Sequence, residues 1–473
     1  MAKSVVSKTG FGTADKNLEA FSLIWLDLNV YKTKDNQETQ KKLRAAINYL
    51  KTFDDPDEFR NYIKQVTPGY YLVLIISGSL GQHEIPRIHH IPQISDIYVK
   101  AVITELSVLV SQVTADQQNR LKLANFLSFE IFFFDKTKKD KSAVSLNGQF
   151  VHWQVLMDVL LRLKVTEKDK KELIDLCKTQ YKGNDLELSI LAEYEQSYSP
   201  TKALQWYTRE CFLYKILNKA FRVQDIHILF LLRSFCRDIY QQLKENQCSH
   251  TIRVYRGQLV SKDELKTLQQ SVNQLISMNS FLSTSVDPKQ ALLFSTGSSI
   301  PHDLERVLFE IEANPNNVAS KPFANVSSHS PFKHEFEVLF MFGSIFRLNK
   351  IRQGSNGIWN IQVTLCSDQE NDLKEVIEHM KNDYGNKKAT LQLFGRVLWK
   401  MGKFDLAEKY YQRMIDELSP NDHLLVDLYD DLGQMAAMKG DLDASLNWKK
   451  KSLNIKAEAI QISAGKNNPK KIF

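Results

Sequence analysis

The sequence predicts a multidomain protein that combines an α/β region, an α+β region and a C-terminal run of helices. Three observations predict this organisation. Short apolar runs alternate with amphipathic stretches in the first third of the chain, a helical stretch gives way to β-rich segments in the middle, and a helical pattern repeats near the end. A length of 473 residues, at about 150 residues per domain, is consistent with about three domains.

Composition narrows the class of protein. Hydrophobic residues make up 43% of the chain and charged residues 25%, a balance that excludes a mostly disordered or fibrous protein. The net charge of +7 is too dilute to favour nucleic-acid binding. No apolar run reaches the roughly 18 residues that span a membrane, and the N-terminal residues lack the apolar core of a signal peptide. Five cysteines without Cys-x-x-Cys spacing favour neither a disulfide framework nor a zinc site. We therefore expect a cytoplasmic protein without metal, membrane or nucleic-acid partners.

The first domain is expected over residues 1–145. Apolar strands are predicted at 21–26, 70–76, 94–101 and 129–134, with helices at 37–51 and 57–66. Such strands separated by amphipathic helices are typical of a parallel sheet that helices cover on both faces. The turn 77–81 (Ser-Gly-Ser-Leu-Gly) follows a strand and could cradle a phosphate, but Gly-rich turns after strands are common. The role of this domain is left open, and the Lys/Asp-rich stretch 136–141 is interpreted as a linker.

The second domain is expected over residues 150–370, as a helical lobe (150–248) followed by a sheet (250–366). Apolar residues recur at three- and four-residue steps through the lobe, and residues 206–214 are rich in aromatic side chains. Short alternating or β-rich segments follow at 252–255, 280–285, 307–311, 335–342 and 361–365. Turn residues separate them, which is typical of a mostly antiparallel sheet.

The third region, residues 385–473, contains an internal repeat. Small residues recur at an interval of 38: Gly395 and Gly433, Gly402 and Gly440, Ala407 and Ser445. The pattern resembles a pair of tetratricopeptide repeats, in which two helices approach closely at the small residues. This interpretation implies a peptide partner at the repeats. An ordinary pair of helical hairpins is the alternative.

Three segments of the second domain carry residues suited to chemistry. Arg256 lies in a Val-Tyr-Arg-Gly segment, Ser283 follows it by 27 residues in Asn-Ser-Phe-Leu-Ser-Thr-Ser, and Glu337 follows Ser283 by 54 in Glu-Phe-Glu. Each segment alone has an ordinary structural explanation. In order and spacing, together with the helical lobe before them, they resemble the R-S-E class of mono-ADP-ribosyltransferases, which includes arginine-specific vertebrate ectoenzymes and several bacterial toxins. The resemblance covers about residues 150–366.

This resemblance implies a central ADP-ribosyltransferase domain that uses NAD as substrate. Arg256 would bind the diphosphate of NAD through its planar set of donors. Gly257, which lacks a Cβ, would let the backbone approach the nicotinamide. Ser283 would hold the site in shape, and Glu337 would stabilise positive charge on the ribose. Glu335 would orient the guanidinium of an acceptor and accept its proton.

Further expectations concern the surroundings of the two glutamates. Two residues apart on a strand, Glu335 and Glu337 are expected to project from one face, and their charges should raise at least one pKa. Phe294 could flank the nicotinamide, and Phe332 corresponds loosely to an aromatic residue on the substrate-recognition turn of this family. A glutamate at the first position goes with arginine acceptors in this family, so the implied partner is a protein with an exposed arginine.

Two alternative functions stay open at this point. The chain could be an inactive transferase fold that serves as a scaffold and binds partner peptides through its repeats. It could also be an NAD glycohydrolase, in which water replaces the acceptor arginine.

Overall fold

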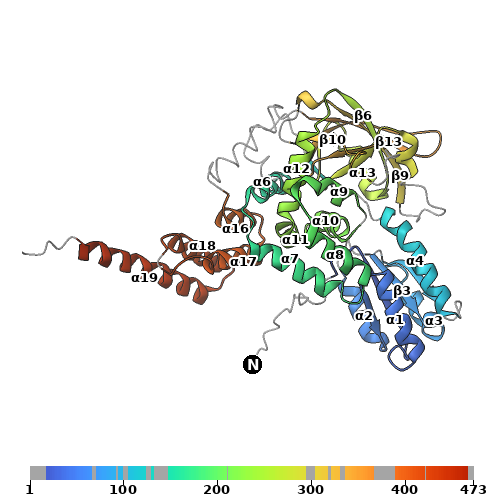
Figure 1. Cartoon of the computed structure of the whole chain (residues 1–473), viewed down its shortest axis with the longest axis horizontal. Coiled ribbons are helices and arrows are strands. Elements are labelled where there is room, and N and C mark those ends of the chain that lie inside the picture. Colours follow the sequence, from blue (N-terminus) through green and yellow to red (C-terminus); the bar gives the residue numbers. More distant parts are fainter. Residues whose placement is uncertain are drawn as a thin grey trace, which may run out of the picture. The chain divides into compact units, whose positions relative to one another are not determined.

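Mixed α/β architecture characterises the computed structural model (Figure 1), which describes residues 17–66, 71–91, 94–99, 105–123, 129–132, 148–209, 211–293, 304–317, 321–330, 336–366, 389–420 and 422–466. The chain divides into two units. Residues 1–134 and 166–368 form the first, and residues 135–165 and 369–473 form the second.

A parallel sheet opens the first unit. Its strands are β1 (Phe21–Leu26), β2 (Leu50–Phe53), β3 (Tyr71–Ile76) and β4 (Ile94–Val99), in the order β2-β1-β3-β4. All neighbouring strands are parallel, which confirms the predicted sheet type. The helix predicted over 37–51 is wrong at its end, because residues from Leu50 onward pair with β1 as a strand.

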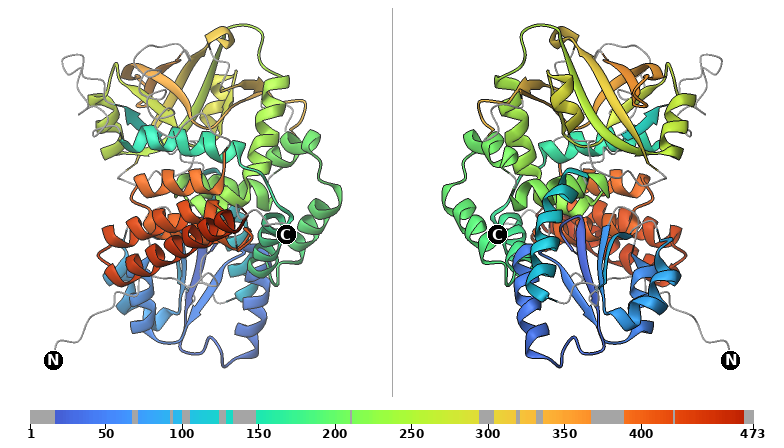
Figure 2. Two further views of the ribbon diagram at one scale, coloured as in Figure 1. Left: turned by 90° about the vertical axis from the view of Figure 1, so that its left-hand side faces the viewer. Right: turned by 90° about the vertical axis from the view of Figure 1, so that its right-hand side faces the viewer.

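Helices cover both faces of this sheet, as predicted. The helices are α1 (Lys34–Ala46), α2 (Pro56–Gln65), α3 (Gly78–Ile88) and α4 (Leu106–Leu123), seen on either side of the blue strands in Figure 2. Because side chains alternate along a strand, Trp25 packs with α1 and α4 while the adjacent Ile24 packs with α2 and α3.

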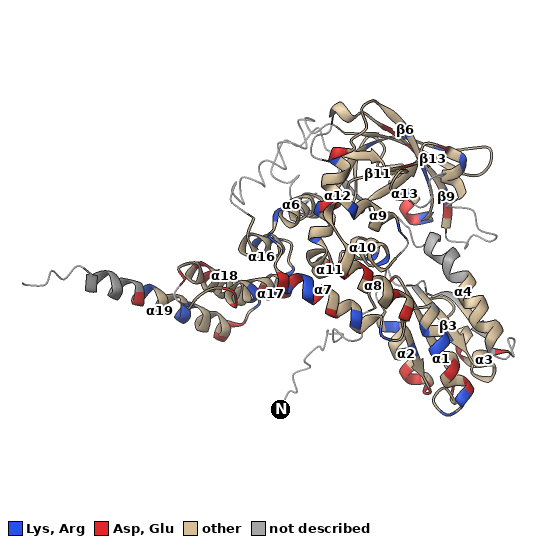
Figure 3. Cartoon of the chain, viewed as in Figure 1, with Lys and Arg blue, Asp and Glu red and all other residues tan. Residues whose placement is uncertain are grey.

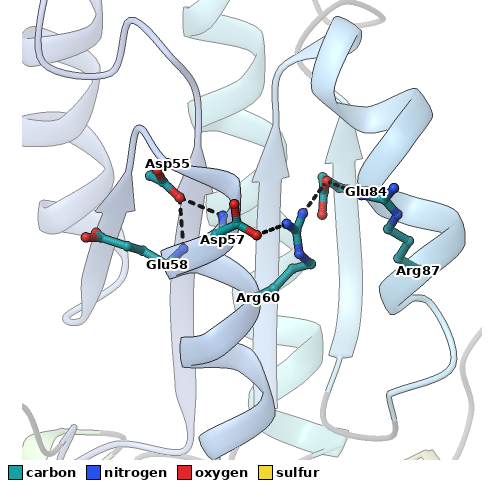
Figure 4. Close-up of polar contacts among 6 residues, drawn as sticks. All are labelled: Asp55, Asp57, Glu58, Arg60, Glu84 and Arg87. Carbon is teal, nitrogen blue, oxygen red and sulfur yellow. Dashed lines mark hydrogen bonds and ion pairs between the residues drawn. The ribbon is translucent and has the colours of Figure 1, made fainter.

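A buried carboxylate links α2 to α3 (Figure 4). Oε1 of Glu84 on α3 accepts hydrogen bonds from Arg60 Nη1 at 2.6 Å and from Arg87 Nη1 at 3.2 Å, and Arg60 also bonds Asp57. The Glu84 side chain is only 4% exposed. Asp55 caps the start of α2 by accepting from two backbone N–H groups. The buried carboxylate of Glu84 is therefore paired with arginines of the covering helices α2 and α3.

The helical lobe of the first unit begins at Thr166. Its helices are α7 (Glu167–Gln180), α8 (Asp185–Ser197), α9 (Ala203–Thr208), α10 (Phe212–Arg222), α11 (Ile226–Leu231) and α12 (Arg233–Glu245). A capping box between Thr166 and Asp169 defines the start of α7.

The second sheet of the first unit has nine strands. They are β5 (Phe129–Phe132), β6 (Ile252–Ser261), β7 (Leu275–Met278), β8 (Leu282–Ser285), β9 (Leu304–Ala313), β10 (Phe323–Asn325), β11 (Glu337–Phe340), β12 (Ser344–Gln353) and β13 (Trp359–Leu365), in the order β10-β11-β8-β6-β9-β13-β12-β7-β5. The helices α13 (Lys262–Gln270) and α14 (Pro288–Leu293) interrupt the strands along the chain. Only the described pair β9–β13 is parallel, so the predicted mostly antiparallel sheet is confirmed.

One strand belongs to a different sheet from the one predicted. The segment 129–134 is expected in the N-terminal sheet, but β5 pairs antiparallel with β7, placing Ile131 opposite Ile276. Backbone hydrogen bonds between strands do not depend on side-chain identity, so a short apolar run does not specify which sheet it joins.

The second unit is helical. It contains α6 (Gly148–Arg162), α16 (Leu391–Lys400), α17 (Phe404–Ile415), α18 (Leu424–Met438) and α19 (Leu442–Lys466). The helix α6, expected in the helical lobe, contacts α16 instead. Among the helices that the structure describes, none is both long and apolar enough to cross a membrane.

The repeat glycines occupy turns and close approaches in this unit. Gly402 and Gly440 have φ of +73° and +82° and lie between the helices of the pairs α16–α17 and α18–α19. A Cβ at Gly395 would lie 2.4 Å from the Tyr411 ring. Two helical hairpins are therefore present at the predicted repeat, whereas the tetratricopeptide interpretation and its peptide partner stay predictions.

Candidate active site

Three predicted site residues lie on three adjacent strands of the nine-stranded sheet. Arg256 lies on β6, Ser283 on β8 and Glu337 at the start of β11, and the strand order is β11-β8-β6. In the antiparallel pair of β8 and β11, Ser283 faces Leu339 and is the diagonal neighbour of Glu337. Residues separated by 27 and 54 positions in the sequence therefore meet at one place.

Hydrogen bonds connect the three residues through Ser283. Its Oγ donates to Glu337 Oε1 at 2.6 Å, and its backbone oxygen accepts from Arg256 Nη1 at 2.8 Å. Glu337 is 9% exposed, while Ser283 and Arg256 are half-buried. A hydroxyl bond to a carboxylate is short and strong, so this contact holds the Glu337 carboxylate in one orientation.

The alternation of side chains along β8 separates the site from the core. Thr284, next to Ser283, turns to the other face and donates from Oγ1 to the backbone oxygen of Val338 at 2.7 Å. Ser285 accepts at Oγ from the backbone N–H of Asp287 at 3.1 Å. In this Ser-Thr-Ser segment, the Ser283 hydroxyl bonds the Glu337 carboxylate.

Gly257 packs against the backbone of α14. A Cβ at this position would lie 2.4 Å from the carbonyl oxygen of Ala291. The sequence-based interpretation assigns the missing side chain to a close approach of nicotinamide. The structure provides a different reason for glycine, because the helix leaves no room for any side chain. The role of Gly257 toward a ligand stays a prediction.

Two tyrosines of the helical lobe belong to the same environment. Tyr207 on α9 is buried, and its ring centroid lies 5.5 Å from that of Tyr214 on α10. Its hydroxyl donates to Asn218 Oδ1 at 3.2 Å. Burial raises the pKa of Tyr207; Tyr214 and Glu337 raise it further, while Arg256 opposes the shift.

The pKa of Arg256 depends on the same two tyrosines. Burial lowers the pKa of Arg256, and Tyr214, Tyr207 and Glu337 oppose the shift. Sequence reasoning places Tyr207 and Tyr214 in an aromatic-rich helical segment and misses them as site residues. Nothing in their spacing from Arg256 indicates that the lobe folds back onto the strands.

An aromatic cluster joins the helical lobe to the sheet beside the site. The Phe281 ring centroid lies 5.1 Å from those of Tyr207 and Phe342, and Phe221 of α10 lies 4.8 Å from Phe342. Aromatic pairs at these distances contribute specific packing energy in addition to buried area. The phenylalanine within the Ser283 segment therefore anchors the lobe next to the site.

Glu335, Phe332 and Phe294 lie outside the described residues, so their predicted roles stay predictions. Phe336, between the two glutamates, has φ of +45° and is 53% exposed. The strand β11 begins at Glu337, so strand alternation does not extend across Phe336. The expectation that Glu335 and Glu337 project from one face stays a prediction, because Glu335 lies outside the described residues.

Charges in the described part of the chain are mixed in sign. Figure 3 shows Lys and Arg interspersed with Asp and Glu along the helices and strands. Among the residues that the structure describes, no group of three or more His, Cys, Asp or Glu is placed to hold a metal ion.

Residues 164–380, somewhat less than half of the chain, match the model of the ADP-ribosyltransferase exoenzyme family. This match agrees with the resemblance to ADP-ribosyltransferases that the motifs indicate. No curated protein matches the chain significantly.

Solved structures of ADP-ribosyltransferases are also similar to part of the chain. The Vis toxin of Vibrio splendidus is 20% identical over 49% of this chain and 88% of its own, with a TM-score of 0.25. An ADP-ribosyltransferase of Clostridium botulinum is 13% identical over 44% of this chain and 98% of its own, with a TM-score of 0.28. Exoenzyme S of Pseudomonas aeruginosa, solved with human 14-3-3 protein beta and Carba-NAD, is 16% identical over 47% of this chain and 96% of its own, with a TM-score of 0.27.

Proposed function

We propose that this protein transfers ADP-ribose from NAD to arginine side chains of acceptor proteins and releases nicotinamide. The observation that carries the proposal is the hydrogen-bonded set of Arg256, Ser283 and Glu337 on adjacent strands. The family match over residues 164–380 supports the same reaction class.

Arg256 is the proposed anchor for the NAD diphosphate. A guanidinium presents planar donors that match phosphate oxygens, and it is more weakly hydrated than an ammonium group. Its half-buried position therefore favours binding of a diphosphate over continued solvation. Gly257 and Phe294 are proposed to contact the nicotinamide, as the family resemblance implies.

Glu337 is the proposed stabiliser of the reacting ribose. When the bond between ribose C1′ and the nicotinamide nitrogen breaks, its electron pair leaves with neutral nicotinamide and positive charge develops on the ribose. A fixed carboxylate beside this charge lowers the barrier, because its orientation costs nothing at the moment of reaction. The bond from Ser283 Oγ supplies that orientation.

Glu335 is the proposed group that selects arginine over water. A guanidinium nitrogen of the acceptor forms the new bond to C1′, and one proton must leave that nitrogen. A free guanidinium has a pKa of at least about 12.5, so a base positioned at the acceptor accelerates this step. Without it, water takes the place of arginine and the reaction is NAD hydrolysis.

The test uses labelled NAD, an arginine-rich acceptor protein and mass spectrometry of the modified residues. Wild type is expected to release nicotinamide and to modify arginine. Glu337→Ala is expected to lose both activities, and Glu335→Gln to lose arginine transfer while retaining some NAD hydrolysis. Absence of nicotinamide release by wild type, or undiminished transfer by Glu337→Ala, would exclude the proposed function. Equal loss of both activities in Glu335→Gln would refute the division of roles.

A further inference from the structure

The residues just before β1 are buried against the helical lobe. This lead-in segment, Asn17–Ala20, is at most 8% exposed at every residue. The backbone oxygen of Asn17 accepts a hydrogen bond from Lys219 Nζ on α10. Oε1 of Glu19 accepts from the Tyr181 hydroxyl, at the end of α7, at 2.8 Å. The N-terminal domain is thus bonded to the lobe through its first described residues.

The lead-in segment is equally well bonded to the N-terminal sheet. Asn17 Nδ2 donates to the backbone oxygen of Phe21 at 2.6 Å and to Ser22 Oγ at 3.0 Å, both on β1. The backbone N–H of Glu19 donates to Asn17 Oδ1 at 2.9 Å. A displacement of β1 would therefore move the backbone oxygen of Asn17, which accepts from α10, and the carboxylate of Glu19, which accepts from Tyr181.

Charged groups on α8 and α10 surround the same point. Lys215 Nζ lies 2.6 Å from Glu187 Oε1 and 3.7 Å from Glu19 Oε1. Oε2 of Glu187 accepts from the backbone N–H of Phe212, the first residue of α10. All three charged side chains are at least four-fifths buried, so each depends on its protein partners.

The helix α10 connects this cluster to the candidate active site. Lys215 lies close to Glu19 of the lead-in segment, and Lys219 bonds Asn17. The residue just before each of these lysines lies beside the site. Those residues are Tyr214 and Asn218, which contact Tyr207, and the Tyr207 ring packs on Phe281, two residues before Ser283. Residues four apart share one face of a helix. One face of α10 therefore carries Tyr214 and Asn218 toward the site, and the neighbouring face carries the two lysines toward the lead-in segment.

We propose that the lead-in segment positions α10, and with it Tyr207 and Tyr214, so that the N-terminal domain controls NAD binding. The proposal rests on the function proposed above. Asn17 and Glu19 are positioning residues, because they act through α10. Loss of the Glu19 carboxylate leaves the Tyr181 hydroxyl without this acceptor in a buried place, which costs more than a bond to water would.

The effect is expected in binding of NAD rather than in chemistry. Ser283 and Glu337 are bonded to each other on the paired strands β8 and β11, so the sheet itself holds their mutual geometry. Couplings between sites are typically about 5- to 150-fold in affinity. We therefore expect an increase of about tenfold in KM for NAD with little change in kcat.

The experiment compares Glu19→Ala with Glu84→Ala in the full chain. Glu84 is a matched control, because it is a buried carboxylate of the same domain and its ion-pair partners are arginines of α2 and α3. Hydrogen–deuterium exchange is measured over residues 203–222, and nicotinamide release is measured against NAD concentration. We expect faster exchange in this segment and a raised KM for Glu19→Ala only. Glu19→Gln, which keeps an oxygen acceptor for Tyr181, is expected to behave like wild type.

The exchange measurement separates this inference from the proposed function, because it needs no enzymatic activity. A wild type that releases no nicotinamide removes the proposed function, and exchange still tests the positioning of α10. Should Glu19→Ala fail to fold, Lys219→Met breaks the bond to Asn17 from the other side and should also accelerate exchange. Unchanged exchange over 203–222, or equal acceleration by Glu84→Ala, overturns the inference. A fall in kcat at constant KM does so as well.

Discussion

The two sheets of the first unit differ in how they use their strands. Every residue of β1 in the parallel sheet is at most 3% exposed, and only Ser22 among them is polar. In the nine-stranded sheet, three adjacent strands each contribute one polar side chain to a common place: Arg256, Ser283 and Glu337. A sheet covered by helices on both faces leaves no room for chemistry along its strands, whereas alternating strands can present a site.

The location of charge follows the same division. In the N-terminal domain the buried carboxylate of Glu84 lies on a covering helix and pairs with arginines. In the nine-stranded sheet the buried carboxylate of Glu337 accepts from a serine hydroxyl. Substitution of Glu84 is therefore expected to reduce the stability of the protein, and substitution of Glu337 is expected to reduce its activity.

The largest effect is expected for Glu337→Gln. The substitution keeps the size of the side chain and removes the charge that would stabilise the ribose, so nicotinamide release should fall by about 100- to 1,000-fold. The urea midpoint should change little. Glu312→Gln is a suitable control, because Glu312 lies on β9 of the same sheet and is more than half exposed. Retention of more than half of the wild-type rate by Glu337→Gln would contradict the role proposed for this carboxylate.

The sequence predicts the three site residues because each motif is local and their order along the chain follows a family pattern. It also predicts the parallel sheet, since runs such as 21–26 are apolar at every position except Ser22. The contributions that it misses depend on tertiary contacts. Tyr207 reaches the site only because the helical lobe folds back, and β5 joins the second sheet through backbone bonds.

The backbone at Phe336 shows a second kind of limit. Its positive φ interrupts the alternation that a Glu-Phe-Glu segment suggests. No residue type in that segment requires this conformation, since the left-handed region favours glycine and asparagine. The residue types of this segment therefore do not indicate where the strand begins, because packing decides it.

The next largest effect is expected for a substitution of Gly257, which follows Arg256 on β6. Gly257→Ala would place a Cβ 2.4 Å from the Ala291 carbonyl oxygen, and a backbone atom of a helix cannot rotate away. We expect the free energy of unfolding to fall by about 1–3 kcal/mol, as for other overpacked positions, together with weaker NAD binding. Gly354→Ala is the control, because its nearest neighbour is the end of the flexible Asn356 side chain. Urea denaturation that shows an unchanged free energy for Gly257→Ala would disprove this packing argument.

Ser283→Ala should have a smaller effect on activity. The substitution removes one hydrogen bond to a charged group, worth about 1.5 kcal/mol, and should lower nicotinamide release about tenfold. Thr284→Val is the matched control, since Thr284 donates to Val338 on the other face of β8. This variant should lose about 1 kcal/mol of stability while its rate stays near that of wild type. Similar losses of rate in both variants would mean that the hydroxyl acts through general stability of the strand.

The smallest effect is expected at the junction of the N-terminal domain and the helical lobe, and it depends on pH. Burial raises the pKa of Glu19 above its ordinary value of 4.5, and Glu187 of α8 adds to the shift. Lys215 of α10 and Tyr181 of α7 oppose it, and Lys219 of α10 bonds the adjacent Asn17. The folded state therefore holds the Glu19 proton more tightly than the unfolded state does.

The sign of the pH dependence follows from this difference. The stability contributed by protonated Glu19 is fully present below pH 4.5 and is lost as the pH rises through the raised pKa of the folded state. Glu19→Gln resembles the protonated form at every pH. Its urea midpoint should match that of wild type in acid and slightly exceed it at neutral pH. A variant that is less stable than wild type at neutral pH would show that attraction to Lys215 outweighs the cost of burying the charge. In that case an ion pair would join the N-terminal domain to α10 of the helical lobe, and the charge of Glu19 would stabilise the fold as the ion pairs of Glu84 do.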